Sequence, residues 1–268
     1  MKGDEKSLVS RDEYFKIAEL VNEVISKIAS FSKIDIEGLR WYHIKAYADK
    51  IDNLEIFPYE FSESTSKALS GFVKNCSGVY LLSYNTNQEI NSGRQHFTFC
   101  HEFYHYLFHF DGTSGNLSFS DLIHKDQYSQ DESPKEIEAN IGASLFLIND
   151  FALLRLLDCN YSFSQLCSRF EVSYSCMWNR LMDYLTFKLE LNWDVSFKIV
   201  NAYRYNDSPF LRLLVLHYGD ISSWVCLNGT VTKENVGELC ESLGVEYHNS
   251  YYYRLHYLVR DFHQTLDV

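Results

Sequence analysis

The amino-acid sequence predicts an α+β fold, on three observations. Apolar side chains recur at helical spacing over residues 11–30, which indicates an amphipathic helix. Two short runs, 53–59 and 79–84, are rich in aliphatic and aromatic residues and are typical of strands. Strand-like and helix-like segments occur together again after residue 190. These features predict helices packed with a small sheet, a helical segment, and a small α+β domain at the C-terminal end.

The first elements have clear boundary signals. Ser10 is a good N-cap for the helix over 11–30, with Glu13 three residues later to complete a capping box. A second helix is expected over 36–50. Turns between the two predicted strands are expected at Ser70-Gly71 and Ser77-Gly78.

The middle of the chain predicts more helices than strands. An aromatic-rich helix is expected over 94–110, a polar loop over 111–133, and a helix over 134–148 that begins at Pro134. The section 151–190 is expected to be all helical. In the C-terminal part we expect strands at 197–205 and 211–218, a helix at 232–243 after Thr232, and a strand or a helix at 249–266.

The predicted domains are 1–150, a helical segment 151–190, and an α+β domain 191–268. With 268 residues, 46% of them hydrophobic, the chain is long enough for a substantial core. Its N-terminus is charged, and no apolar run approaches the roughly 20 residues of a membrane span. The seven cysteines are odd in number and lack a C-x-x-C pair, so we expect reduced thiols in a soluble cytoplasmic protein with no membrane partner.

The motif most specific to one chemistry is His101-Glu102-Phe103-Tyr104-His105, an H-E-x-x-H sequence. On a helix, residues i and i+4 lie on one face, so both imidazoles can bind one zinc ion. Glu102 lies beside them and can take a proton from water, whose pKa zinc lowers from about 16 to about 7. Random draws would give this pattern roughly 0.03 times in such a chain. The alternative is a helix whose histidines only pack among aromatic side chains.

A catalytic zinc site also needs a third protein ligand. Glu136 lies on the next predicted helix, with Asn140 one turn later on the same face. Glu138 points about 160° away from Glu136 around the helix, so only one of the two can face the metal. For either carboxylate the alternative is a solvated position on the surface.

Other residues near the motif are weaker candidates. His109 is four residues after His105, but the helical rise places it about 12 Å along the axis from His101, so we expect a structural role. His96 lies outside the i, i+4 spacing and is a candidate for supporting a ligand. Tyr104, and His124 in the predicted loop, are candidates to border the cleft and to hydrogen-bond an oxyanion.

These residues resemble the ImmA/IrrE-type metallo-endopeptidases, over roughly residues 15–185. Members carry a Ser-Gly pair, a strand that ends in Asn, and a helix with the pattern Arg-x-x-Phe-Thr-x-Ala-His-Glu-x-x-His. A second family motif reads Glu-x-x-Ala-Asn-x-Phe-Ala-x-x-Leu-Leu-Met-Pro. The corresponding positions here are Ser70-Gly71, Asn85, Arg94 through His105, and Glu136 through Asn149.

The resemblance implies a zincin-like fold with an active-site helix and a small sheet. It selects Glu136 as the third zinc ligand beside His101 and His105. It also implies that Glu102 is the general base and that Asn140 supports the ligands. The chain departs from the family pattern at three positions that carry neither ligand nor base: Cys100 for Ala, Gly142 for Phe, and Asn149 for Pro.

A helix-turn-helix-like segment follows the second motif, at residues 163–181. Glu171 replaces the usual turn glycine, and it is both disfavoured at positive φ and repelled by phosphate. The net charge of −12 also weighs against nucleic acid as the main ligand. We therefore favour a structural or substrate-docking bundle over a DNA-binding one.

The resemblance implies cleavage of another protein, typically a helix-turn-helix transcriptional repressor, by zinc-activated water. The alternative is a regulator that contains zinc and binds a repressor or DNA without cutting it. The intact Glu102 favours the enzyme.

Overall fold

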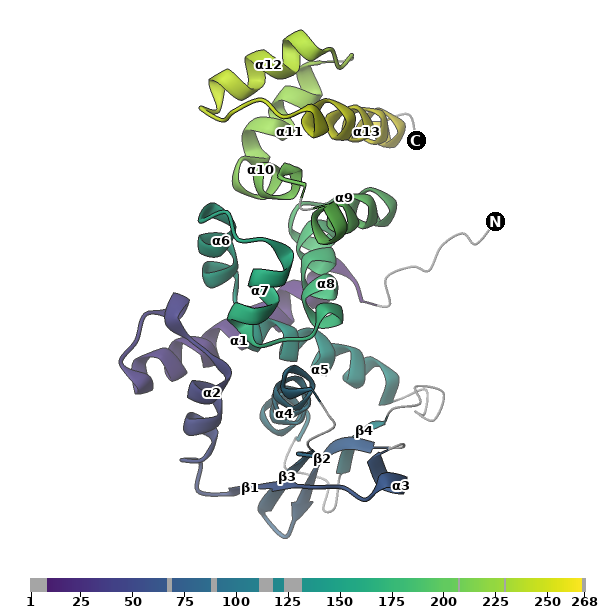
Figure 1. Ribbon diagram of the computed structural model, residues 1–268. Helices are drawn as coiled ribbons and strands as arrows, with labels where there is room; N and C mark the ends of the chain where they lie inside the picture. Colours follow the sequence, from purple (N-terminus) through teal and green to yellow (C-terminus); the bar gives the residue numbers. More distant parts are fainter. Residues whose placement is uncertain are drawn as a thin grey trace. The chain divides into compact units, whose positions relative to one another are not determined.

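The computed structural model describes residues 9–66, 69–87, 91–110, 118–122, 132–206, 208–228 and 230–266. The chain forms two compact units, each described by itself below. The first unit comprises Met1–Leu153 and Cys167–Met177, and the second comprises Leu154–Leu166 and Trp178–Val268. Figure 1 shows the strands gathered in the first unit and helices in the second.

The predicted N-terminal helix is confirmed as α1 (Arg11–Ser32). Ser10 caps it, and Glu13 completes the capping box by accepting a hydrogen bond from the Ser10 backbone. The predicted second helix is shorter than expected. A 3₁₀ turn (Ile36–Gly38) comes first, and α2 begins only at Trp41 and ends at Ala48, because the two residues between them are extended.

The sheet of the described residues has the strand order β1-β3-β2-β4. Strand β1 (Leu54–Tyr59) runs parallel to β3 (Val79–Asn85), while β2 (Leu69–Cys76) is antiparallel to both β3 and β4 (Ser118–Leu122). A short helix, α3 (Glu63–Ser66), lies between β1 and β2. The central pair Val73 and Leu82 is fully buried.

Two sequence expectations about the sheet were wrong. Ser70-Gly71 is not a turn but lies in β2. The glycine is needed there because a side chain at position 71 would collide with α4, and not because the chain reverses direction. Part of the predicted loop 111–133 forms β4, and the other residues of that loop up to 131 lie outside the described ranges. The turn at Ser77-Gly78 is confirmed, with positive φ at both residues.

Two helices stand between the sheet and α1. Helix α4 (Ser92–Phe108) packs on the sheet, and α5 (Glu132–Leu147) packs on α4, with α1 against α5. Figure 1 shows α4 next to the strands with α5 beyond it. Asn91 caps α4 by accepting a hydrogen bond from the Gly93 N–H. The α+β, zincin-like architecture expected for this part of the chain is therefore present.

The predicted all-helical section is also confirmed. It contains α6 (Asp150–Asp158), α7 (Phe163–Phe170), α8 (Tyr174–Asp183) and a π-helical turn (Tyr184–Lys188). The turn between α7 and α8 has the left-handed residue of a helix-turn-helix, because Glu171 adopts φ 54° despite its side chain.

The predicted strands at 197–205 and 211–218 were wrong. The regular elements in the described residues from 193 onward are all helices: α9 (Trp193–Asn206), α10 (Phe210–Leu216), α11 (Tyr218–Leu227), α12 (Lys233–Ser242) and α13 (Asn249–Leu266). Helix α10 is buried on several sides, so its apolar run has no clear period and cannot be told from a strand by pattern. The expected α+β character of 191–268 is thus replaced by a helical one, while the helix after Thr232 is confirmed.

None of the described helices is, taken singly, long and apolar enough to cross a membrane. The seven cysteines form no disulfide in the structure.

Candidate metal centre

Two imidazoles and one carboxylate meet between α4 and α5. Glu136 Oε2 lies 3.1 Å from His101 Nε2, and Glu136 Oε1 lies 3.2 Å from His105 Nε2. The two histidine Nε2 atoms are 3.1 Å apart. Among the described residues, this is the group of three donors that could hold a metal ion, with all ligand atoms within 4.8 Å of one another. The helical spacing of the two histidines and the facing position of Glu136 are those expected from the sequence.

The three side chains are buried, and their surroundings favour the protonation states that bind metal. Burial lowers the pKa of His105 to about 3, although the neighbouring Glu136 carboxylate opposes this shift. Burial would raise the pKa of Glu136, but its close contacts with the His101 and His105 imidazoles outweigh burial and bring the value to about 2. At neutral pH His105 is therefore neutral and Glu136 is ionised, which leaves lone pairs for a cation.

Asn140 supports His101 from the same helix that carries Glu136. Its Oδ1 lies 3.2 Å from His101 Nδ1, one turn after Glu136 on α5. An amide oxygen only accepts hydrogen bonds, so His101 Nδ1 is the donor and Nε2 keeps its lone pair. Asn140 thus orients the ligand without being a ligand itself.

Glu102 follows His101 in the sequence and is fully buried on the side of α4 that faces the sheet. A Cβ added to Gly71 of β2 would lie 3.2 Å from Glu102 Cγ and 2.5 Å from Thr98 Cγ2. Only glycine at position 71 lets α4 approach β2 this closely. The Ser-Gly pair therefore determines how closely α4 packs on the sheet, and with it the position of Glu102.

Other motif residues fix the join between α4 and the sheet. Arg94, in the first turns of α4, donates a hydrogen bond to Ser70 Oγ of β2 at 3.0 Å. Asn85 ends β3, and its side-chain oxygen accepts hydrogen bonds from the backbone N–H groups of Phe61 and Asn87. These contacts hold the ends of two strands next to the helix that carries the histidines.

Residues 62–182 match the family described as the IrrE N-terminal-like domain. This segment belongs to that peptidase family. The match contains His101, Glu102, His105 and Glu136, together with every motif residue described above. No curated protein matches the chain. Peptidase activity on a protein substrate, with a metal ion at the buried cluster, is the function that the family indicates.

Two departures from the family pattern are explained by local structure in the IrrE N-terminal-like domain. Asn149, where the pattern has Pro, accepts a hydrogen bond from the Ala152 N–H at 2.8 Å and so begins α6. Cys100 is fully buried, and burial raises the pKa of its thiol well above the usual value, with Cys176 adding to the shift. The thiol is therefore protonated and acts as a small core residue.

The third departure, Gly142, is matched by Tyr104 of the H-E-x-x-H helix. A Cβ added to Gly142 would lie 2.0 Å from Tyr104 Cδ2. The Tyr104 ring is 1% exposed and thus occupies the space that a side chain at position 142 would fill. Tyr104 also packs against Phe108 and His109. Its ring contacts are those of a residue that joins α4 to α5.

We expect Gly142→Ala to destabilise the protein by about 1–3 kcal/mol, because the new methyl group overlaps the Tyr104 ring. The measurement is chemical unfolding of the zinc-free chain. Gly237→Ala in α12 is the matched control, since an added Cβ there meets no atom within 4 Å and alanine favours a helix. Equal stability of Gly142→Ala and the parent would show that Tyr104 has room to move.

The start of α4 is anchored to the turn between α7 and α8. His96 donates from Nδ1 to the carbonyl oxygen of Glu171 at 3.1 Å, and its ring stacks on Trp41 at 4.0 Å between centroids. A Cβ added to Gly93 would lie 2.8 Å from the backbone of Val172. The contacts of His96 are therefore with α2 and this turn rather than with the three candidate ligands.

His109 and Glu138 form contacts that the sequence did not predict. His109 does not join the three donors, in agreement with its position along the axis, but its Nδ1 lies 2.7 Å from His105 Nδ1. Glu138 is only partly solvated, since Oε2 lies 3.1 Å from His109 Nε2. The sequence signal for the contact between His105 and His109 is their spacing of four residues on one helix. His124 lies outside the described residues.

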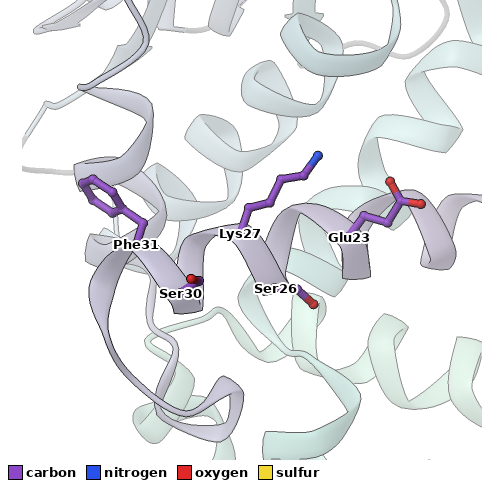
Figure 2. Close-up of a pocket in the computed structure, with 5 residues that line it drawn as sticks. All are labelled: Glu23, Ser26, Lys27, Ser30 and Phe31. Atoms are coloured by element: carbon purple, nitrogen blue, oxygen red, sulfur yellow. The ribbon is translucent and has the colours of Figure 1, made fainter.

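A surface depression on α1 is a weaker candidate for a site. Figure 2 shows the exposed side chains that line it: Glu23, Ser26, Lys27, Ser30 and Phe31. All five come from one helix and they include no histidine or cysteine, so this lining offers neither a nucleophile pair nor a metal-ligand set. The chemistry of the first unit is concentrated between α4 and α5.

Proposed function

We propose that this chain is a zinc-dependent endopeptidase. The observation that carries the proposal is the buried group of His101, His105 and Glu136, with Glu102 next to it on α4. Two imidazoles and one carboxylate are a donor set typical of catalytic zinc sites, which keep a further position open for water. The residues present therefore fit the ion that the family implies.

Zinc bound there supplies Lewis acidity, which makes water more acidic and polarises a peptide carbonyl. Glu102 accepts the proton of the attacking water and passes it to the nitrogen of the leaving amine. His101 and His105 present their Nε2 atoms, and Asn140 keeps His101 in that orientation. Glu102 follows His101 on α4, and its burial against the sheet limits the motion of its side chain.

The proposed substrate is a helix-turn-helix transcriptional repressor in the cytoplasm, so that cleavage would regulate transcription. The family resemblance supports the substrate class, and seven cysteines without a disulfide suit a reducing compartment. The acidic chain and the anchored α7–α8 turn weigh against DNA as the main ligand.

Removal and return of zinc tests the proposal. The purified chain should carry about one zinc ion, and treatment with a chelator should abolish cleavage of a co-expressed helix-turn-helix repressor. One equivalent of zinc should restore cleavage, because the three candidate ligands offer donor atoms within 4.8 Å of one another. Mass spectrometry of the repressor fragments gives the cut site.

The matched variants are His101→Ala and His105→Ala, which should hold no zinc and cut nothing. Full zinc content in both variants would exclude this site. Zinc binding with tight capture of an uncut repressor by the parent chain would instead support the alternative, a regulator that does not cleave.

A further inference from the structure

His109 ends α4 one turn after His105 and lies against it. Their Nδ1 atoms are 2.7 Å apart, and the rings meet edge to face with centroids 4.7 Å apart. The His109 side chain is 5% exposed, and the Tyr104 ring packs edge-on against it at 5.2 Å. His109 is therefore fixed beside the His105 nitrogen that Glu136 does not contact.

The other nitrogen of His109 faces Glu138 of α5. Its Nε2 lies 3.1 Å from Glu138 Oε2. An ionised carboxylate only accepts hydrogen bonds, so His109 Nε2 is the donor. In a neutral imidazole the second nitrogen, Nδ1, then carries the lone pair and accepts a hydrogen bond from His105 Nδ1. This arrangement leaves the lone pair of His105 on Nε2, the atom beside His101 and Glu136.

We infer that His109 and Glu138 are positioning residues that hold His105 in the tautomer and ring orientation that bind the metal. The inference rests on the proposed function, because it needs a metal at the site. Carboxylates and carbonyl oxygens that accept from a ligating histidine commonly have this role. Here the His109 imidazole lies between His105 and the Glu138 carboxylate. The other candidate ligand, His101, contacts Asn140 directly.

The test is the zinc affinity of the full chain, measured by competition with a chromogenic chelator at fixed pH. His109→Ala should weaken zinc binding roughly 10–100-fold, the usual effect of losing such a partner. His109→Asn should restore most of the affinity, because its side-chain oxygen can accept from His105 Nδ1. Glu138→Ala should cost roughly tenfold, the lower end of that range, because water can replace a partly exposed carboxylate.

Two controls separate positioning from folding. Glu19→Ala removes an exposed glutamate from α1 and should leave zinc affinity unchanged. Unfolding of the zinc-free variants should show similar stability for His109→Ala and His109→Asn. A packing role alone would lower both stabilities and would give no recovery of affinity with Asn.

Parental zinc affinity in His109→Ala overturns the inference, as does an equal loss of affinity in the Ala and Asn variants. If His109→Ala does not fold, Glu138→Ala decides, and parental affinity there overturns the inference. The proposed function fails separately, if His101→Ala and His105→Ala still bind zinc. Loss of zinc in those two variants with no change in the His109 and Glu138 variants would reject the positioning role alone.

Discussion

Glu102→Gln is expected to lower the rate of repressor cleavage by roughly 10²–10⁴-fold, the usual contribution of a positioned general base. Glutamine keeps the size of the side chain but cannot take up a proton. Glu102 is fully buried where α4 packs on β2, and a Cβ at Gly71 would lie 3.2 Å from Glu102 Cγ, so the side chain has little room to move. The measurement is the initial rate of cleavage at saturating zinc.

Zinc content separates this effect from loss of the site. Glu102→Gln should bind zinc as the parent does, since Glu102 is not among the three candidate ligands. Glu19→Gln, on the exposed face of α1, is the control for the same chemical change and should cut normally. Cleavage by Glu102→Gln at the parental rate would assign the proton transfer to another group.

Glu136→Ala should abolish stable zinc binding and with it cleavage. The carboxylate contacts both imidazoles, one through each oxygen, so its removal takes away one of three protein ligands and the partner of the other two. We expect a loss beyond the roughly 100-fold limit typical of supporting residues. Metal analysis after dialysis and the chelator competition described above measure it.

Asn140→Ala and Glu138→Ala are the comparators, because both residues lie on α5 within one turn of Glu136. Each should retain measurable zinc binding, with losses inside the range for supporting residues. A ranking in which Glu138→Ala loses zinc and Glu136→Ala keeps it would contradict the geometry of the site.

Local spacing was enough to predict His101, Glu102 and His105, because one helix carries all three. Glu136 required a second helix, and it was found only by combining the helical face with the family resemblance. The role of His109 was missed for a physical reason. The rise along α4 excludes it as a ligand, but its contact with His105 depends on side-chain rotamers and on Glu138 from α5.

The contrast between local spacing and contacts between elements also explains which parts of the fold were predicted. Helices with a one-sided apolar face, such as α1, were predicted with their caps. Strand β2 was missed because Ser70-Gly71 is typical of turns, whereas here the glycine serves close packing with α4. Helix α10 was mistaken for a strand because burial on several sides removes the periodicity on which the distinction depends.

The contacts between α4 and the α7–α8 turn limit where the chain can be truncated. Cys167–Met177 returns to the first unit after the chain has left it at Leu153. A fragment that ends at 150 would lack the Glu171 carbonyl that holds His96 and the backbone against which Gly93 rests. The N-terminal end of α4, the helix that carries both histidines, would then lose these contacts. A fragment that keeps the whole first unit must therefore extend at least to Met177.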